Sequence, residues 1–145
     1  PSYYRMDGGV LAVRYSNDGH SVFGKTLTVC LPQGTVLNFC DIDVISANVY
    51  ADVDTKDLDI DSVSGNILYS TWYAPYEVDI DTTSGSVTVA FPEDFGFVCD
   101  FDSASGGYSS EFRVYIRDGY ICYGNLFSSL EIDTVSGNLD LVINR

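Results

Sequence analysis

Hydrophobic and polar residues alternate along most of this chain, and a short Ser-Gly step interrupts the alternation at regular intervals. In "LDIDSVSGNI", Leu58 and Ile60 fall on one side of an extended strand, and Asp59 and Asp61 fall on the other. Alternation resumes after the step, so each step joins two strands. No segment keeps the apolar spacing of an amphipathic helix. The pattern therefore predicts an all-β protein built from short, half-buried strands.

The same phrase occurs five times, starting at residues 40, 58, 78, 99 and 130, so the intervals are 18, 20, 21 and 31 residues. Two strands and two turns in 18–21 residues are typical of one coil of a β-solenoid, in which equivalent residues stack about 4.8 Å apart. A two-sheet β-sandwich of hairpins is the alternative. The two architectures differ at Ile60 and Ile80, which would pair in parallel in the solenoid and antiparallel in the sandwich.

A length of 145 residues is typical of one domain. We expect a single β-solenoid domain over 1–145. It would have irregular capping coils in 1–38, regular repeats in 39–107, an inserted hairpin in 108–129 and a last repeat in 130–145. Asp118-Gly119, between two alternating stretches, is the turn signal for the hairpin. Taken in chain order, the predicted inward columns are Cys40, Leu58, Val78, Cys99 and Leu130, and beside them Ile42, Ile60, Ile80, Phe101 and Ile132.

The second acidic position of the phrase is Asp in every copy and stands three residues before the turn serine. A carboxylate there can accept hydrogen bonds from backbone N–H groups of the turn, so we interpret it as structural. Glycine allows a positive φ, and Ala47 in its place predicts a gentler or slightly strained turn. Asn48 and Asn66 could form a short ladder. The predicted turn residues are Asp43, Asp61, Asp81, Asp102, Asp133, Gly65, Gly85, Gly106 and Gly137.

The first acidic position has no turn to cap, and its side chains would stack outward in one column. Like charges about 5 Å apart repel by roughly 1 kcal/mol in water. A solvated acidic face, a weak Ca²⁺ site or a face for a cationic partner would each relieve this repulsion. We assign no metal site, and Asp59, Asp79 and Asp100 are the candidates for weak Ca²⁺ binding. The column consists of Asp41, Asp59, Asp79, Asp100 and Glu131.

Charge and cysteine usage exclude several classes. Seven basic and 21 acidic residues give a net charge of −14, which disfavours nucleic acid and anionic membrane surfaces. No apolar run is long enough to cross a bilayer. The chain opens at "PSYYRMDGG" without a signal-like run, so we expect that a leader or anchor is missing. Cys30, Cys40, Cys99 and Cys122 form no C-x-x-C pair or Cys/His cluster, which predicts buried free thiols.

Catalytic motifs are not found. "DLDIDS" from Asp57 imitates the start of an EF-hand loop, but Ser62 stands at its glycine position and Leu68 at its closing glutamate. The only histidine, His20, lies in a polar turn. Abundant carboxylates would imitate a glycosidase pair anywhere, so they are no evidence for one. We expect a protein that is not an enzyme, with no catalytic residue and no cofactor.

The segments "LTVCLP", the repeated "DIDxxSGN" units and the final "LEIDTVSGNLDLVI" resemble the toastrack-type putative adhesins, which are β-strand repeat domains of bacterial cell-envelope proteins. The resemblance runs from about Val10 to Ile143. It implies an extracytoplasmic β-solenoid without a catalytic site.

Two functions follow from this resemblance. The first is a surface binding module that recognises a protein or a glycan. The second is a sensory or regulatory domain of an envelope-stress system. Exposed aromatics gathered on one side would favour the binding module, and the candidates are Tyr73, Tyr76, Tyr108 and Tyr115.

Overall fold

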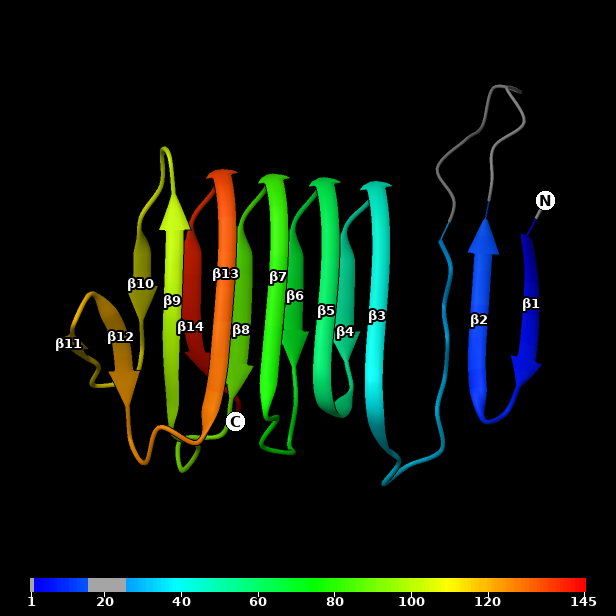
Figure 1. Cartoon of the computed structure of the whole chain (residues 1–145), viewed down its shortest axis with the longest axis horizontal. Helices are drawn as coiled ribbons and strands as arrows, with labels where there is room; N and C mark the ends of the chain where they lie inside the picture. The colour runs from blue at the N-terminus through cyan, green and yellow to red at the C-terminus, as the bar shows by residue number, and fades with distance from the viewer. Residues whose placement is uncertain (1, 16–25) are drawn as a thin grey trace. The chain divides into compact units, whose positions relative to one another are not determined.

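The computed structural model describes residues 2–15 and 26–145, and every helix or strand assigned among them is a β-strand (Figure 1). The all-β prediction is therefore confirmed, and the described residues contain no helix that could cross a membrane. The strands are β1 (Ser2–Asp7), β2 (Val10–Tyr15), β3 (Val36–Ser46), β4 (Val49–Asp52), β5 (Asp54–Ser64), β6 (Ile67–Ser70), β7 (Glu77–Ser84), β8 (Val87–Phe91), β9 (Phe97–Ser103), β10 (Tyr108–Ser110), β11 (Tyr115–Arg117), β12 (Tyr120–Tyr123), β13 (Ser128–Ser136) and β14 (Leu139–Ile143).

The chain divides into two compact units, Pro1–Leu31 and Pro32–Arg145. In the first unit, β1 and β2 form an antiparallel hairpin around Gly8 and Gly9, which both have positive φ. Two-residue hairpin turns favour glycine for this reason. The segment 1–38, expected to form capping coils of a single domain, is thus shared between two units. His20 lies outside the described residues.

The second unit contains two sheets, and each copy of the phrase places one strand in each of them. The larger sheet has the order β11-β12-β9-β13-β7-β5-β3, and the smaller one β10-β14-β8-β6-β4. The repeat strands pair in parallel in both sheets, and Ile60 pairs with Ile80 in parallel register. Parallel neighbours bring equivalent residues of the repeats side by side, so each column of the phrase becomes a column on a sheet.

The order of the repeats in space differs from their order in the chain. β13, from the last repeat, lies between β7 and β9, so Leu130 pairs with both Val78 and Cys99. The predicted chain-order stack is wrong at this point. The physical reason lies in the inserted hairpin: β12 pairs antiparallel with β9 and occupies its outer edge. The last repeat therefore adds on the other side of β9, next to β7.

The inserted hairpin is shorter than the predicted range 108–129. Its strands are β11 and β12, and they turn at Asp118 and Gly119, both of which have positive φ. β10 belongs instead to the fourth repeat, because it pairs in parallel with β14 in the smaller sheet. The hairpin predicted from Asp118-Gly119 is present, but the predicted range extends beyond it at both ends.

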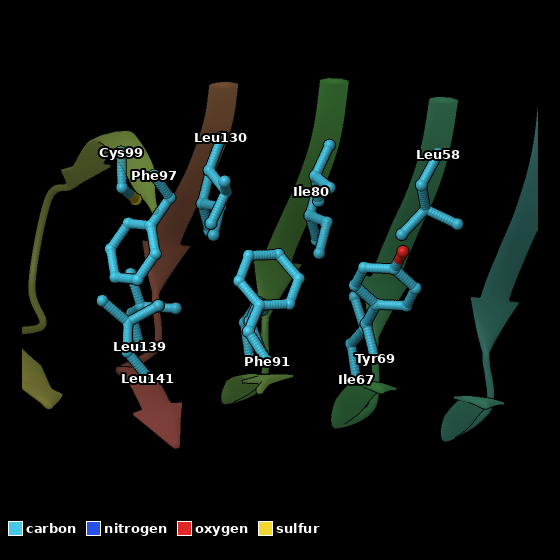
Figure 2. Packing of buried hydrophobic residues seen from close by; sticks show 14 of the residues in the cluster. Leu58, Ile67, Tyr69, Ile80, Phe91, Phe97, Cys99, Leu130, Leu139 and Leu141 are labelled. Atoms are coloured by element: carbon cyan, nitrogen blue, oxygen red, sulfur yellow. The ribbon is translucent and has the colours of Figure 1, made fainter. Parts of the chain in front are cut away.

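The hydrophobic core of this unit is formed by side chains from both sheets (Figure 2). Leu58 and Ile80 come from the larger sheet, and Tyr69 and Phe91 from the smaller one, with the Tyr69 and Phe91 rings packed edge to face at 6.2 Å between centroids. Edge-to-face packing is a favoured arrangement of aromatic rings. Near the hairpin, Phe97 continues the core. The two sheets therefore bury the apolar side of the inner repeat strands, whereas Cys40, Ile42 and Val44 on β3 are only half-buried.

All four cysteines are free thiols, as expected, but their burial differs. Cys99 and Cys122 are buried, Cys40 is half-buried, and Cys30 is exposed. Burial raises the pKa of the Cys99 thiol to about 12. Because the thiolate is the reactive form, Cys99 acts as a small core residue and not as a nucleophile. The expectation of burial is wrong for Cys30.

Candidate functional site: an acidic sheet face and an aromatic loop

The outer face of the larger sheet carries two adjacent columns of carboxylates. Both acidic positions of the phrase alternate with core residues such as Ile60 and Ile80, so both point away from the core. Strand pairing places these groups in register across five strands. The columns are Asp41, Asp59, Asp79, Glu131 and Asp100, and beside them Asp43, Asp61, Asp81, Asp133 and Asp102.

Four of the carboxylates on this face, Asp59, Asp61, Asp79 and Asp133, have raised pKa values. Burial, followed by the negative charges of Asp81, Asp59, Glu131 and Glu77, raises the pKa of Asp79 to about 6. The pKa values of Asp59, Asp61 and Asp133 are also raised, first by burial and then by their acidic neighbours. A charge in a column with like charges on both sides is least favourable in the middle of the sheet, where Asp79 lies.

The candidate Ca²⁺ ligands do not form one group. Asp59 and Asp79 are neighbours, but Glu131 separates Asp79 from Asp100. Within residues 2–15 and 26–145, no three His, Cys, Asp or Glu side chains are arranged to hold a metal ion. The stack expected for Asp59, Asp79 and Asp100 is therefore wrong, because the last repeat inserts between the third and the fourth.

Asparagine side chains, and not the second-position aspartates, bond the turns of neighbouring repeats. The Asn66 N–H donates to Asn48 Oδ1 (2.9 Å), the Ser86 N–H to Asn66 Oδ1 (3.0 Å), and the Gly107 N–H to Asn138 Oδ1 (3.0 Å). The ladder expected for Asn48 and Asn66 is present. In the described part of the chain, no hydrogen bond joins a turn N–H to any of the five aspartates. These aspartates are exposed and belong to the second acidic column: Asp43, Asp61, Asp81, Asp102 and Asp133.

The turn glycines are required chiefly by close approach between turns. A Cβ on Gly106 would lie 1.9 Å from the carbonyl oxygen of Gly137, and a Cβ on Gly137 would lie 2.1 Å from that of Gly85. Gly65 and Gly85 also have positive φ, at 125° and 136°. Ala47 begins this series, and its carbonyl oxygen is the one that Gly65 approaches. Ala47 does not have a positive φ. Alanine is therefore tolerated at this position, which is the first of the series.

A second surface is formed by the loop between β6 and β7, which reads "TWYAPY" over residues 71–76. Trp72 is 59% exposed and Tyr76 is 51% exposed. Phe127, from the segment before β13, is 50% exposed, and its ring centroid lies 5.5 Å from that of Tyr76. Large aromatic side chains exposed together on a loop are typical of recognition surfaces. We refer to Trp72, Tyr76 and Phe127 as the aromatic surface, in which Tyr76 contacts Phe127 and Trp72 belongs to the same loop as Tyr76.

Buried and backbone groups fix the conformation of this loop. Asp54 Oδ1 accepts hydrogen bonds from the backbone N–H of Trp72 (2.8 Å) and of Tyr73 (3.1 Å) and from Thr71 Oγ1 (3.0 Å). The buried Ser128 hydroxyl donates to the Pro75 carbonyl at 2.6 Å. One carboxylate oxygen that accepts from three donors holds the loop firmly, because hydrogen bonds to charged groups are stronger than those between neutral groups.

The aromatic residues expected to gather on one side are divided between separate elements. Tyr73 and Tyr76 lie in the β6–β7 loop, Tyr108 lies on β10, and Tyr115 lies on β11. No sequence pattern indicated Phe127, because its contact with Tyr76 joins distant parts of the chain. Trp72 could have been found, since three aromatics in a six-residue loop are unusual where loops are normally polar.

The sequence matches Toastrack DUF4097 over residues 33–141. The chain belongs to the Toastrack DUF4097 family. The resemblance drawn from the repeats is thus confirmed. No curated protein matches this Toastrack chain. The solved structure of a putative cell adhesion protein from Clostridium sporogenes is similar, with a TM-score of 0.71 and 15% identity over 99% of this chain and 76% of that chain. At this identity, the likeness concerns the fold.

Proposed function

We propose that this Toastrack chain is a non-catalytic binding module of the bacterial cell surface or envelope, and that it recognises a protein or a glycan. The observation that carries the proposal is the aromatic surface of Trp72, Tyr76 and Phe127, which is exposed although its loop is held by many hydrogen bonds. The family and the similarity to a protein described as a putative cell adhesion protein agree with this role.

The rigidity of the loop supports binding on energetic grounds. A loop that orders only in the complex costs binding free energy, whereas a loop that is already ordered avoids this cost. Asp54 and Ser128 hold the loop before any partner arrives. Tryptophan and tyrosine are also the residues that most often dominate binding free energy at interfaces. An exposed and rigid aromatic surface is therefore suited to docking another molecule.

We also propose that the two sheets are the walls of a β-solenoid and not of a sandwich of hairpins. The support is the parallel pairing of the repeat strands, with Ile60 beside Ile80 and Ile67 beside Val87. Hairpins would pair consecutive strands antiparallel. A solenoid presents long flat faces that suit extended binding surfaces. A crystal structure of the chain would test this architecture directly. Parallel pairing of Ile60 with Ile80 and of Ile67 with Val87 would support the solenoid, and antiparallel pairing would support the sandwich.

The function is tested by applying the fluorescently labelled full chain to a glycan array and to a panel of immobilised cell-surface proteins. Two variants are tested: the single substitution Trp72→Ala, and the double substitution Tyr76→Ala, Phe127→Ala. Each should weaken binding by roughly 30-fold, which corresponds to a hot-spot loss of about 2 kcal/mol. Tyr50→Ala is the matched control, because Tyr50 is 76% exposed but lies on β4. Equal losses in control and test variants, or no binding to either panel, would contradict the proposal.

A further inference from the structure

We propose that the free edge of β3 binds an extended basic segment of a partner polypeptide, which adds to the larger sheet as one more strand. β3 has eleven residues and stands last in that sheet. In the described part of the chain it pairs only with β5. A long edge strand carries a row of N–H and C=O groups without a strand partner, and such a row is a template for strand addition.

The core is incomplete next to this edge. Cys40, Ile42 and Val44 face the core side of β3 but are only half-buried. In the neighbouring strand, Leu58 and Ile60 occupy the same columns and are almost completely buried. The difference is that β5 has a strand on each side. An added strand with apolar residues at alternate positions would cover the half-buried column.

On the other side of the repeat strands, the inserted hairpin covers part of the β9 edge. There β12 pairs with β9, with Ile121 next to Cys99, and Ile121, Cys99 and Phe112 are all buried. The inserted hairpin thus covers β9 over residues 97–99, with which β12 pairs. The described residues of the second unit contain no equivalent strand beyond β3.

Charge determines which strand fits the β3 edge. Asp41 and Asp43 are exposed on the outer face of β3, and each already has an aspartate beside it on β5. In an added strand, the outward residues would lie next to these two carboxylates. Opposite charges on neighbouring strands stabilise the pair, and like charges destabilise it. The occupant therefore alternates apolar and basic residues.

The same charges disfavour a second copy of this chain. Antiparallel pairing of two β3 strands centred on Ile42 would place Asp41 of one copy opposite Asp43 of the other, and parallel in-register pairing would place identical aspartates side by side. Both arrangements bring carboxylates together on a face that already has raised aspartate pKa values. Charged residues on an edge are a known way of preventing self-association. A basic strand would pair with the backbone N–H and C=O groups of β3 without this repulsion.

The test uses a fluorescent peptide, Thr-Val-Lys-Val-Lys-Val-Thr, titrated with the full chain and followed by anisotropy. The double variant Asp41→Lys, Asp43→Lys should bind it at least about tenfold more weakly, because two attractive neighbours become repulsive. This variant should prefer the acidic peptide Thr-Val-Glu-Val-Glu-Val-Thr. The matched control is Asp79→Lys, Asp81→Lys, with the same charge change in the same columns but on β7, where both residues pair with β5 on one side and with β13 on the other.

Each outcome bears on the proposal. Retained affinity in the β7 variant, together with loss on N-methylation of the alternate peptide amides, would support strand addition, because only a strand uses those amides. Equal losses in the two double variants would assign binding to the general negative field and overturn the proposal, as would no binding of the lysine peptide. Asp41→Asn, Asp43→Asn gives a milder check if the charge reversal impairs folding. Trp72→Ala should leave peptide affinity unchanged, which separates this surface from the aromatic one.

Discussion

Glu131 pairs in parallel register with Asp79, although 52 positions separate the two residues in the chain. This pairing places the last repeat next to the third and separates the third from the fourth. Asp79 therefore has acidic residues of two other repeats as neighbours, Asp59 on one side and Glu131 on the other. The raised pKa of Asp79 follows from this position in the middle of the sheet.

Acidification from pH 7 to pH 5 should stabilise the protein. The folded-state pKa of Asp79 is about 6, above the value of about 4 for an unfolded aspartate, and those of Asp59, Asp61 and Asp133 are also raised. Between these pH values the folded state binds more protons than the unfolded one, so stability falls as pH rises through 6. Urea unfolding at pH 5, 6 and 7 measures this, and a higher midpoint at pH 7 than at pH 5 would refute it.

Asp79→Asn should raise the urea midpoint at pH 7 and flatten its dependence on pH. The substitution removes a charge that burial and four acidic neighbours disfavour. Asp94→Asn is the control with the same change of charge, because Asp94 is exposed in the turn between β8 and β9. A pH profile that is as steep in Asp79→Asn as in the wild type would show that another group dominates.

Asn66→Ala should cost about 0.5–1.5 kcal/mol of unfolding free energy, the range for one hydrogen bond. Asn66 Oδ1 accepts from the Ser86 N–H of the next turn, and alanine removes that acceptor. Asp81→Ala should be neutral or stabilising, because Asp81 is exposed among like charges. Chemical denaturation of both variants compares the two positions, and a larger loss for Asp81→Ala would restore the turn role predicted from the sequence.

Gly137→Ala should destabilise the fold by about 1–3 kcal/mol, as overpacking does in closely packed sites. Its new Cβ would lie 2.1 Å from the Gly85 carbonyl oxygen, so the two turns would have to separate. Ala47→Gly is the complementary change at the end of the series, and its cost should stay below about 1 kcal/mol. Thermal unfolding of the two variants makes the comparison. Similar melting temperatures for both would mean that the turns move apart easily.

Ile132→Ala should cost about 2–5 kcal/mol, whereas Ile42→Ala should cost clearly less. The two residues occupy the same core column, but Ile132 is fully buried between β7 and β9, and Ile42 is half-buried at the β3 edge. The cost of a cavity depends on how completely the site is enclosed. Equal losses in urea unfolding would indicate that the β3 edge is covered in solution.

Local sequence patterns were enough to predict the strands, the repeats and the outward position of both acidic columns. Alternation has a period of two, so the residues on each face follow from the order of neighbours alone. The Asp118-Gly119 hairpin could also be predicted, because its turn depends on φ at two adjacent residues. In each case, the interaction that decides the structure acts between residues close in the chain.

Tertiary structure decided the order of the repeats and the composition of the candidate sites. Five similar phrases can stack in several orders with similar local interactions, and β12 on the outer edge of β9 left the last repeat a place beside β7. That order separated Asp100 from Asp79. The contact of Tyr76 with Phe127 and the anchoring of Trp72 by Asp54 likewise join different repeats. Contacts between distant repeats depend on which strand neighbours which, and no local pattern contains that information.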